Sequence, residues 1–203
     1  LHEPHLYPEL SELREMLRDW RFYHHFDSSP TSPIRQPQTG FYTPILSSDG
    51  HDLAAALQTI IEDDPTRLYR AISNAFPGAQ LRIVGDRGRF SVEMEMPGVF
   101  RPLRAVELSD GTLRYLCLAA ALLSPKAPQL LALNEPETSL HPELIKPLAT
   151  LIVGAAELSQ MWVTSHSRQL CDAISKQADT RLVELAIIDG ETVIPDEPLI
   201  HVD

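Results

Sequence analysis

Two short apolar runs that end abruptly in polar residues constrain the fold of this sequence more than any other feature. Residues 130–133 are followed by Asn134 and Glu135, and residues 161–164 are followed by Ser165 and His166. A short, continuously apolar run is typical of a strand buried in a parallel sheet. Open α/β sheets place their ligands at the carboxyl ends of such strands. We therefore expect these polar residues at the sheet edge, facing a ligand crevice.

The pattern around these strands predicts an α/β protein with a mainly parallel sheet covered on both faces by helices and an added antiparallel hairpin. Helical spacing or apolar composition predicts helices at residues 6–17, 52–62, 65–76 and 113–123. Residues 20–26 read as an aromatic strand or a helix end. Further strands are expected at residues 81–84, 90–96, 103–108 and 182–188, with a turn at 189–190 into a last strand.

Three regions follow from this pattern. Residues 1–50 hold a helix and then a Pro- and Ser-rich loop or surface insertion, because four prolines between residues 30 and 44 exclude a long helix. Residues 51–105 form a helical and β-hairpin subdomain, and residues 106–203 form the core that carries the motifs. At 203 residues and 43% hydrophobic composition, the chain can bury one sizeable core.

The formal net charge of -11 argues against a chain that coats nucleic acid through bulk electrostatics. Seven arginines nevertheless lie between residues 67 and 104. They favour a solvated sheet face, with phosphate contact as the alternative. Cys117 and Cys171 lack metal or redox spacing and are expected to be buried thiols, so a reducing cytoplasm is the expected compartment. No membrane segment or secretory signal is expected.

The segment Leu108-Ser109-Asp110-Gly111-Thr112 precedes a nearly continuous apolar helix. The free N–H groups of a first helical turn and the helix dipole together favour an anion. A Ser and a Gly at this position therefore suit phosphate contact. The alternative for the isolated motif is that Ser109 simply caps the helix.

Glu135 and His166 have the chemistry for phosphoryl transfer. A carboxylate at a sheet edge can orient or deprotonate a water beside a γ-phosphate. A histidine there can donate a hydrogen bond to phosphate at neutral pH. Taken singly, Asn134 and Glu135 could just begin a turn, and His166 could be a cap or a surface group. The polar turn Thr138-Ser139-Leu140-His141-Pro142 lies between the two strands, with Pro142 placed to begin a helix.

The order and spacing of these segments resemble the second half of ABC-type ATPases. Leu108–Thr112 looks like the signature motif, residues 130–137 like Walker B, residues 138–142 like the D-loop and residues 165–167 like the switch region. The wording Asn-Glu-Pro-Glu-Thr-Ser-Leu-His-Pro is most similar to predicted ATPases of the RecF, SMC and overcoming-lysogenization-defect group. This resemblance covers roughly residues 106–190 and implies a P-loop NTPase fold that binds ATP and Mg²⁺.

The resemblance also implies a role for each matching residue. Glu135 would be the catalytic carboxylate and His166 the γ-phosphate sensor. The remaining positions expected at the nucleotide or the dimer seam are Ser109, Asp110, Gly111, Asn134, Ser139 and His141. In this family two heads sandwich two nucleotides, so each site is completed across a homodimer interface. Signature residues would then contact the ATP that the second subunit holds.

The sequence departs from the family pattern in two places. Asn134 stands where Walker B commonly has Asp, which removes a charge from the magnesium shell and weakens a metal role for this residue. A P-loop needs glycines and a following lysine. The three lysines, Lys126, Lys146 and Lys176, never follow a glycine. We expect the Walker A loop in an N-terminal segment or a separate chain, so the 203 residues alone should be inactive.

The leading hypothesis is ATP hydrolysis by a head-to-head dimer that acts on DNA or on an effector partner. Asn134 motivates the alternative of a nucleotide-dependent clamp or regulatory module with negligible turnover. A nuclease-associated ATPase is a third reading, in which the nuclease belongs to another chain. The histidines at 2, 5, 24, 25 and 51 match no standard metal spacing, and a glutamine in Arg35-Gln36-Pro37-Gln38 is a weak Q-loop candidate.

Overall fold

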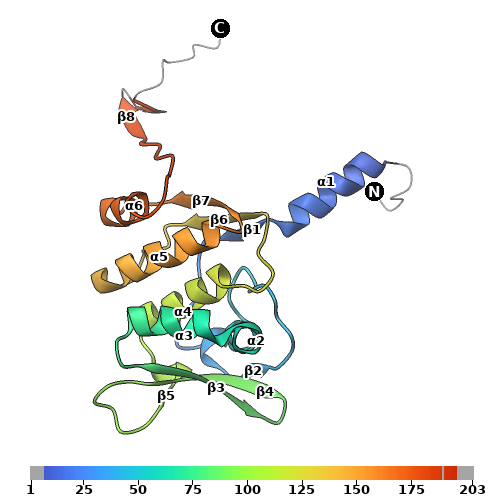
Figure 1. The fold of residues 1–203 in the computed structure, drawn as a ribbon, viewed down its shortest axis with the longest axis vertical. Helices are drawn as coiled ribbons and strands as arrows, with labels where there is room; N and C mark the ends of the chain where they lie inside the picture. Colours follow the sequence, from blue (N-terminus) through green and yellow to red (C-terminus); the bar gives the residue numbers. More distant parts are fainter. Residues whose placement is uncertain (1–6, 189, 196–203) are drawn as a thin grey trace.

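In the computed structural model, which describes residues 7–188 and 190–195, helices separate a parallel sheet from an antiparallel one (Figure 1). The parallel sheet has the order β1-β6-β7, and the antiparallel sheet has the order β2-β4-β3 with β5 paired to β4. This arrangement confirms the mixed α/β class. Within the described residues, no helix is long and apolar enough to cross a membrane.

The parallel sheet contains both strands on which the sequence argument rests. These are β6 (Leu130–Asn134) and β7 (Gln160–Thr164), and β1 (Arg21–Tyr23) pairs with the other edge of β6. Leu131 and Leu133 are almost fully buried because their side chains face the helices. The aromatic segment after the first helix is therefore a strand, which decides between the two sequence readings.

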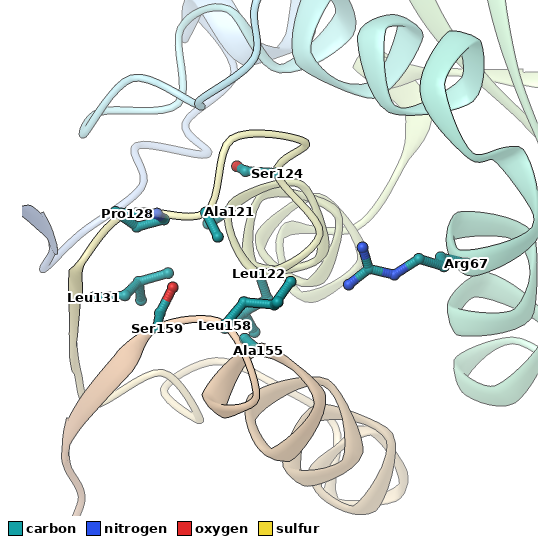
Figure 2. Close-up of a pocket in the computed structure, with 10 residues that line it drawn as sticks. Arg67, Ala121, Leu122, Ser124, Pro128, Leu131, Ala155, Leu158 and Ser159 are labelled. Atoms are coloured by element: carbon teal, nitrogen blue, oxygen red, sulfur yellow. The ribbon is translucent and has the colours of Figure 1, made fainter. Parts of the chain in front are cut away.

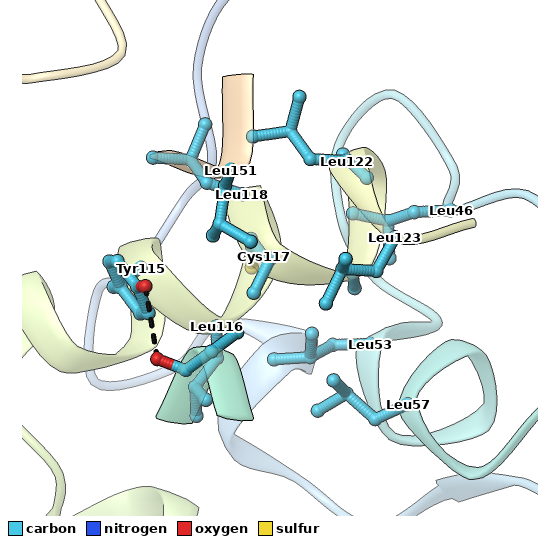
Figure 3. Close-up of a cluster of buried hydrophobic side chains, with 14 of the residues drawn as sticks. Leu46, Leu53, Leu57, Tyr115, Leu116, Cys117, Leu118, Leu122, Leu123 and Leu151 are labelled. Carbon is cyan, nitrogen blue, oxygen red and sulfur yellow. Dashed lines mark hydrogen bonds between the residues drawn. The ribbon is translucent and has the colours of Figure 1, made fainter. Parts of the chain in front are cut away.

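Two helices bury one face of this sheet, namely α4 (Asp110–Leu122) and α5 (Ile145–Ala156) (Figure 1). Every residue of α4 from Leu113 to Leu122 is buried, as expected for a helix with no polar face. Figure 3 shows this helix surrounded by leucines, with Tyr115 donating a 3.3 Å hydrogen bond to the carbonyl of Ala71. Cys117 is buried in the same cluster and is a free thiol.

The other face of the parallel sheet is open in the described residues, so the expectation that helices cover both faces is wrong here. Phe22, Ala132 and Trp162 form one cross-strand row on that face. The two aromatic side chains are 58% and 64% exposed. The alternation of buried and exposed residues along β1, β6 and β7 follows from burial on a single face.

The N-terminal region leads from helix α1 (Pro8–Asp19) through β1 into the Pro-rich loop. This loop is anchored in the core, because Ile34 and Leu46 are only 1% exposed. The loop contains the 3₁₀ turn η1 (Pro33–Arg35) and the short strand β2 (Gln38–Thr39). Helices α2 (Leu53–Asp63) and α3 (Pro65–Ala75) follow, close to the expected ranges.

The antiparallel sheet accounts for most of the arginine-rich block. Its hairpin is β3 (Gln80–Asp86) and β4 (Arg89–Glu95), and β5 is only Leu103–Arg104, followed by the 3₁₀ turn η2 (Ala105–Glu107). Arg82 pairs with Glu95 at 2.9 Å, and Arg101 pairs with Glu107 at 2.5 Å. Because these arginines are paired with carboxylates of the same chain, they favour the prediction of a solvated sheet face over the alternative of phosphate contact.

The C-terminal elements differ most from the sequence expectation. After η3 (Pro142–Leu144), α5 and β7, the chain forms α6 (Arg168–Ser175). Of the strand expected at residues 182–188, only β8 (Ala186–Ile188) forms, and it pairs with β9 (Glu191–Val193) in a separate hairpin. The central sheet therefore does not continue into this segment. Residue 189 of the expected turn lies outside the described residues.

Candidate functional site

The carboxyl ends of β1, β6 and β7 meet at one edge of the parallel sheet. There the side-chain amide of Asn134 lies 2.7 Å from Nδ1 of His24, which follows β1. The hydroxyl of Thr164, the last residue of β7, donates to Oδ1 of Asn134 at 2.7 Å. Asn134 is thus the centre of a polar chain that joins all three strand ends. Both ends of its side chain already have protein partners.

Glu135 and His166 follow β6 and β7 and lie next to each other at this edge. Nε2 of His166 is 3.3 Å from Oε1 of Glu135, and the two side chains are 89% and 42% exposed. The Glu135 backbone has a φ of 46°, in the left-handed region that non-glycine residues rarely adopt. Its N–H still donates to the carbonyl of Thr164 at 2.9 Å. Both groups can therefore reach a ligand outside the sheet edge.

Glu137 connects the turn after β6 to the turn after β7. Its Oε1 accepts hydrogen bonds from the Ser165 hydroxyl at 2.6 Å, the His166 N–H at 3.0 Å and the Ser167 N–H at 3.2 Å. A carboxylate that accepts several donors is held firmly, because each hydrogen bond is charge-assisted. The backbone that carries His166 is thus attached to the turn that carries Glu135.

The signature segment forms the start of α4. The side-chain hydrogen bonds of Ser109 there are made within the same helical turn. Ser109 is the N-cap, and its Oγ accepts from the Thr112 N–H at 3.1 Å. Gly111 lies close to the turn after β6, since a Cβ at this position would be 2.8 Å from the carbonyl oxygen of Ser139. Ser139 itself has a φ of 65°. The cap interpretation of Ser109 therefore holds, and it leaves the exposed helix start open to a ligand.

Asp110 is paired with a buried arginine of η1. Nη2 of Arg35 lies 2.6 Å from Oδ1 of Asp110, and the Arg35 side chain is only 8% exposed. Nη1 of Arg35 also donates to the carbonyls of Ala105 at 3.0 Å and Leu108 at 2.8 Å. A guanidinium with five donors suits several acceptors at once. Arg35 therefore fixes the backbone that leads into the signature segment.

The remaining site residue from the sequence is His141, which lies at the start of η3. Its side chain is 69% exposed, and its Nδ1 accepts from the Glu143 N–H at 3.4 Å. Of the two glutamines in the weak Q-loop candidate segment, Gln38 has a structural role. Its Oε1 accepts from the Ala54 N–H at 2.7 Å, and its Nε2 donates to the Pro33 carbonyl at 3.1 Å.

Sequence reasoning missed four residues that organise the site: His24, Arg35, Arg114 and Glu137. His24 carried a usable signal, because it is a polar residue directly after an aromatic run. Arg35 and Arg114 gave none, and Glu137 entered only as the last residue of the segment that resembles Walker B, because the partners of all three within the site are 21 or more residues away in the chain. Their roles depend on the tertiary fold.

Neither a metal cluster nor a pocket offers a competing site in the described part of the chain. No group of three or more His, Cys, Asp or Glu residues could hold a metal ion there. A small pocket is lined by Arg67, Leu122, Leu131 and Ser159 among others (Figure 2). It lies near the amino-terminal ends of β6 and β7, whereas ligands of open α/β sheets bind at the carboxyl ends.

Comparison with known families agrees with this geometry. Residues 7–172 match the family described as "AAA domain, putative AbiEii toxin, Type IV TA system". The chain belongs to this AAA-domain family. The match spans all three strand ends and the start of α4, so the edge described above is part of the AAA domain. No curated protein matches the chain.

Solved structures with the same fold include ATPase heads of SMC proteins. One, from work titled "Structural biochemistry of ATP-driven dimerization and DNA stimulated activation of SMC ATPases", has a TM-score of 0.53 and 17% identity over 68% of this chain and 86% of that chain. The SMC head with coiled coil and joint from Pyrococcus yayanosii has a TM-score of 0.53 and 19% identity, covering 67% and 26%.

An SMC head bound to the C-terminal winged-helix domain of ScpA has a TM-score of 0.53 and 15% identity, covering 73% of this chain and 53% of that chain. The AAA domain thus spans most of the first of these structures but about half or less of the other two. Identities this low establish the fold alone. The AAA domain has the P-loop NTPase fold, and its family and fold are those of nucleotide-dependent ATPases.

Proposed function

We propose that this AAA domain binds and hydrolyses ATP as part of a head-to-head homodimer. The observation that carries the proposal is the juxtaposition of Glu135 and His166, 3.3 Å apart, at the carboxyl edge of the parallel sheet. In this arrangement Glu135 orients or deprotonates the attacking water. His166 donates a hydrogen bond to the γ-phosphate. Both side chains are exposed enough to meet a nucleotide.

The start of α4 serves the nucleotide held by the second subunit. Ser109 and Gly111 are at the helix N-terminus, where unpaired N–H groups and the dipole favour phosphate oxygens. Asp110 contributes indirectly, because its carboxylate is bound to Arg35. Ser139 and His141 are exposed on the neighbouring turn and belong to the dimer seam.

The P-loop comes from a segment outside these 203 residues, either N-terminal to them or on a separate chain. None of the three lysines in the sequence follows a glycine, as a P-loop requires. The open sheet row of Phe22 and Trp162 supports an additional covering layer, because parallel sheets are normally covered on both faces. These 203 residues alone are expected to be inactive.

Magnesium accompanies ATP in this proposal, held mainly by the nucleotide phosphates. Mg²⁺ commonly uses only one or two protein oxygens together with substrate phosphates and waters. Asn134 fits only weakly, since it is neutral and its Oδ1 already accepts a hydrogen bond from Thr164. Glu135 is the adjacent carboxylate.

The dimer acts on DNA or on an effector protein. The similar SMC structures are described with ATP-driven dimerisation, DNA-stimulated activation and binding of ScpA, and these features support the same classes of partner for this chain. The family description names a toxin of a toxin–antitoxin system, which favours an effector role. Arg82 and Arg101 already form ion pairs with carboxylates of the same chain, so they give no additional support for DNA binding.

The test is the steady-state rate of ATP hydrolysis by this chain together with the segment that supplies its P-loop, called here the P-loop-bearing protein. Glu135→Gln and His166→Ala should each lower kcat by about 100-fold or more, the contribution of a well-placed general base or phosphate donor. Binding of ATP should persist in both variants. Turnover equal to that of the unmodified protein in both variants would refute the proposal.

A nucleotide-dependent clamp with negligible turnover is the second candidate, and Asn134 favours it. The residue removes a negative charge where a magnesium ligand is expected, and its side chain is engaged by His24 and Thr164. Sedimentation of the P-loop-bearing protein with ATP, combined with a phosphate-release assay, separates the two functions. ATP-dependent dimers without phosphate release support the clamp, and release that depends on Glu135 supports the ATPase.

A further inference from the structure

Two buried polar atoms near the catalytic edge have no hydrogen-bond partner in the described structure. They are Nε of Arg114, on α4, and Oε2 of Glu137, in the turn after β6. Buried polar atoms nearly always have a hydrogen-bond partner, so an unpaired one needs a structural or functional reason. These two carry opposite charges and belong to the two elements on which the proposed ATP site depends.

Arg114 connects the signature helix to the catalytic turn. It lies four residues after Asp110, the first residue of α4, and is 6% exposed. Its Nη2 donates to the backbone carbonyl of Glu135 at 3.2 Å. Burial lowers the pKa of Arg114, and the nearby carboxylates of Glu137 and Glu135 act in the opposite direction. The guanidinium is therefore a buried cation close to two carboxylates.

The contact falls on a strained part of the backbone. Glu135 has a φ of 46°, a strained conformation for a non-glycine residue that the surrounding contacts must stabilise. The Arg114 hydrogen bond to the Glu135 carbonyl and the Glu135 N–H bond to Thr164 fix both sides of this residue. Without Arg114, the direction of the Glu135 side chain would be less well defined.

Glu137 fixes the position of the turn that carries His166. Its Oε1 accepts from the backbone N–H groups of His166 and Ser167 and from the Ser165 hydroxyl. Because Glu137 is two residues after Glu135, one short turn determines the position of both proposed catalytic groups. Its second oxygen, Oε2, is buried without a hydrogen-bond partner among the described residues and forms no ion pair with Arg114, so the two residues act through the turn that they both hold.

We propose that Arg114 and Glu137 are positioning residues that join the signature helix, the turn of Glu135 and the turn of His166 into one unit. This inference rests on the proposed function. In a head-to-head dimer, α4 contacts one nucleotide through Ser109 while Glu135 and His166 act on the other. The pair therefore links the two composite sites through a single subunit. Neither residue touches the nucleotide in this scheme.

The experiment measures kcat and the Kd for ATP in the P-loop-bearing protein. Glu137→Ala should lower kcat by about 100-fold, as misplacement of reacting groups does, while Kd changes by less than about threefold. Glu137→Gln keeps an oxygen acceptor for the three donors and should recover at least about one tenth of the kcat. Glu157→Ala, at the exposed end of α5, is the matched control.

A double-mutant cycle tests whether Arg114 and Glu137 act together on kcat. Arg114→Met should lower kcat strongly, whereas Arg70→Met on the exposed side of α3 should not. Combining Arg114→Met with Glu137→Gln should cost less than the product of the two single effects, because the residues act together. If Arg114→Met does not fold, as its melting curve will reveal, the Glu137 series decides alone.

Two outcomes overturn the inference while leaving the proposed function intact. One is a Glu137→Ala variant with the kcat of the Glu157→Ala control, and the other is a loss of ATP affinity as large as the loss of kcat. In both cases Glu135→Gln must still abolish turnover. If Glu135→Gln turns over ATP normally, the proposed function fails first and the inference fails with it.

Discussion

At the scale of single residues, the site depends on side chains that hold backbone in place. Arg35 is the clearest case, because its buried guanidinium binds the carbonyls of Ala105 and Leu108 and the carboxylate of Asp110. Removing it would take the guanidinium donor from the carbonyls of Ala105 and Leu108 and leave the carboxylate of Asp110 without its partner. Such losses are costly because the remaining polar groups stay desolvated.

Arg35→Ala should therefore lower the free energy of unfolding by about 2–4 kcal/mol. Arg82→Ala is the control, since the Arg82 pair with Glu95 is half-exposed and should contribute less than about 1 kcal/mol. Urea unfolding monitored by circular dichroism measures both. Equal, small effects for the two variants would mean that Arg35 does not organise the signature segment.

Single residues also mark where sequence reasoning succeeds. The sequence predicts Glu135 and His166 at the sheet edge because each is the second residue after an apolar run, and the structure brings them together. Arg35, Arg114 and Glu137 could not be found in this way. Their partners are distant in sequence and are backbone atoms as often as side chains, so no spacing or composition signals them.

At the scale of elements, the start of α4 and the turn after β6 fit closely together. Gly111 permits this contact, because a Cβ there would approach the Ser139 carbonyl oxygen to 2.8 Å. The opposing atom belongs to the backbone of a turn with positive φ at Ser139, which has little freedom to move. The glycine is thus needed for packing in addition to its proposed contact with nucleotide.

Gly111→Ala should destabilise the protein by about 1–3 kcal/mol, as overpacking does. The matched control is Gly154→Ala in α5, where a Cβ would meet no atom within 4 Å. That variant should be more stable by about 0.5–1 kcal/mol, because alanine is the better helix former. Thermal unfolding of the two variants should shift in opposite directions, and a shared direction would contradict this account of the contact.

Element boundaries followed the sequence pattern where apolar periodicity was strong. The helices α2, α3 and α4 and the strands β6 and β7 all begin within three residues of the expected positions. The pattern failed for residues 182–185, whose apolar side chains form no strand. A strand also needs a neighbour to pair with, and local sequence does not reveal whether one is present.

At the scale of the whole molecule, the parallel sheet has one covered and one open face. The parallel pairing of β6 with β7 and the helices on the covered face follow from the alternation of strands and helices in the sequence, whereas the position of β1 beside β6 was not predicted. The open row of Phe22 and Trp162 could not be predicted, because apolar strand residues look the same whether or not a layer covers them. The open face is the part of the sheet at which the structure differs from the expected cover of helices on both faces.

The central claim is that each ATP site is shared between two subunits, and subunit complementation tests it most directly. Ser109→Arg and Glu135→Gln variants of the P-loop-bearing protein should each be inactive alone. When the two are mixed, half of the dimers pair one variant with the other, and each such dimer contains one site with both groups intact. The mixture should recover up to about a quarter of the unmodified turnover. A mixture as inactive as its two components would contradict the account.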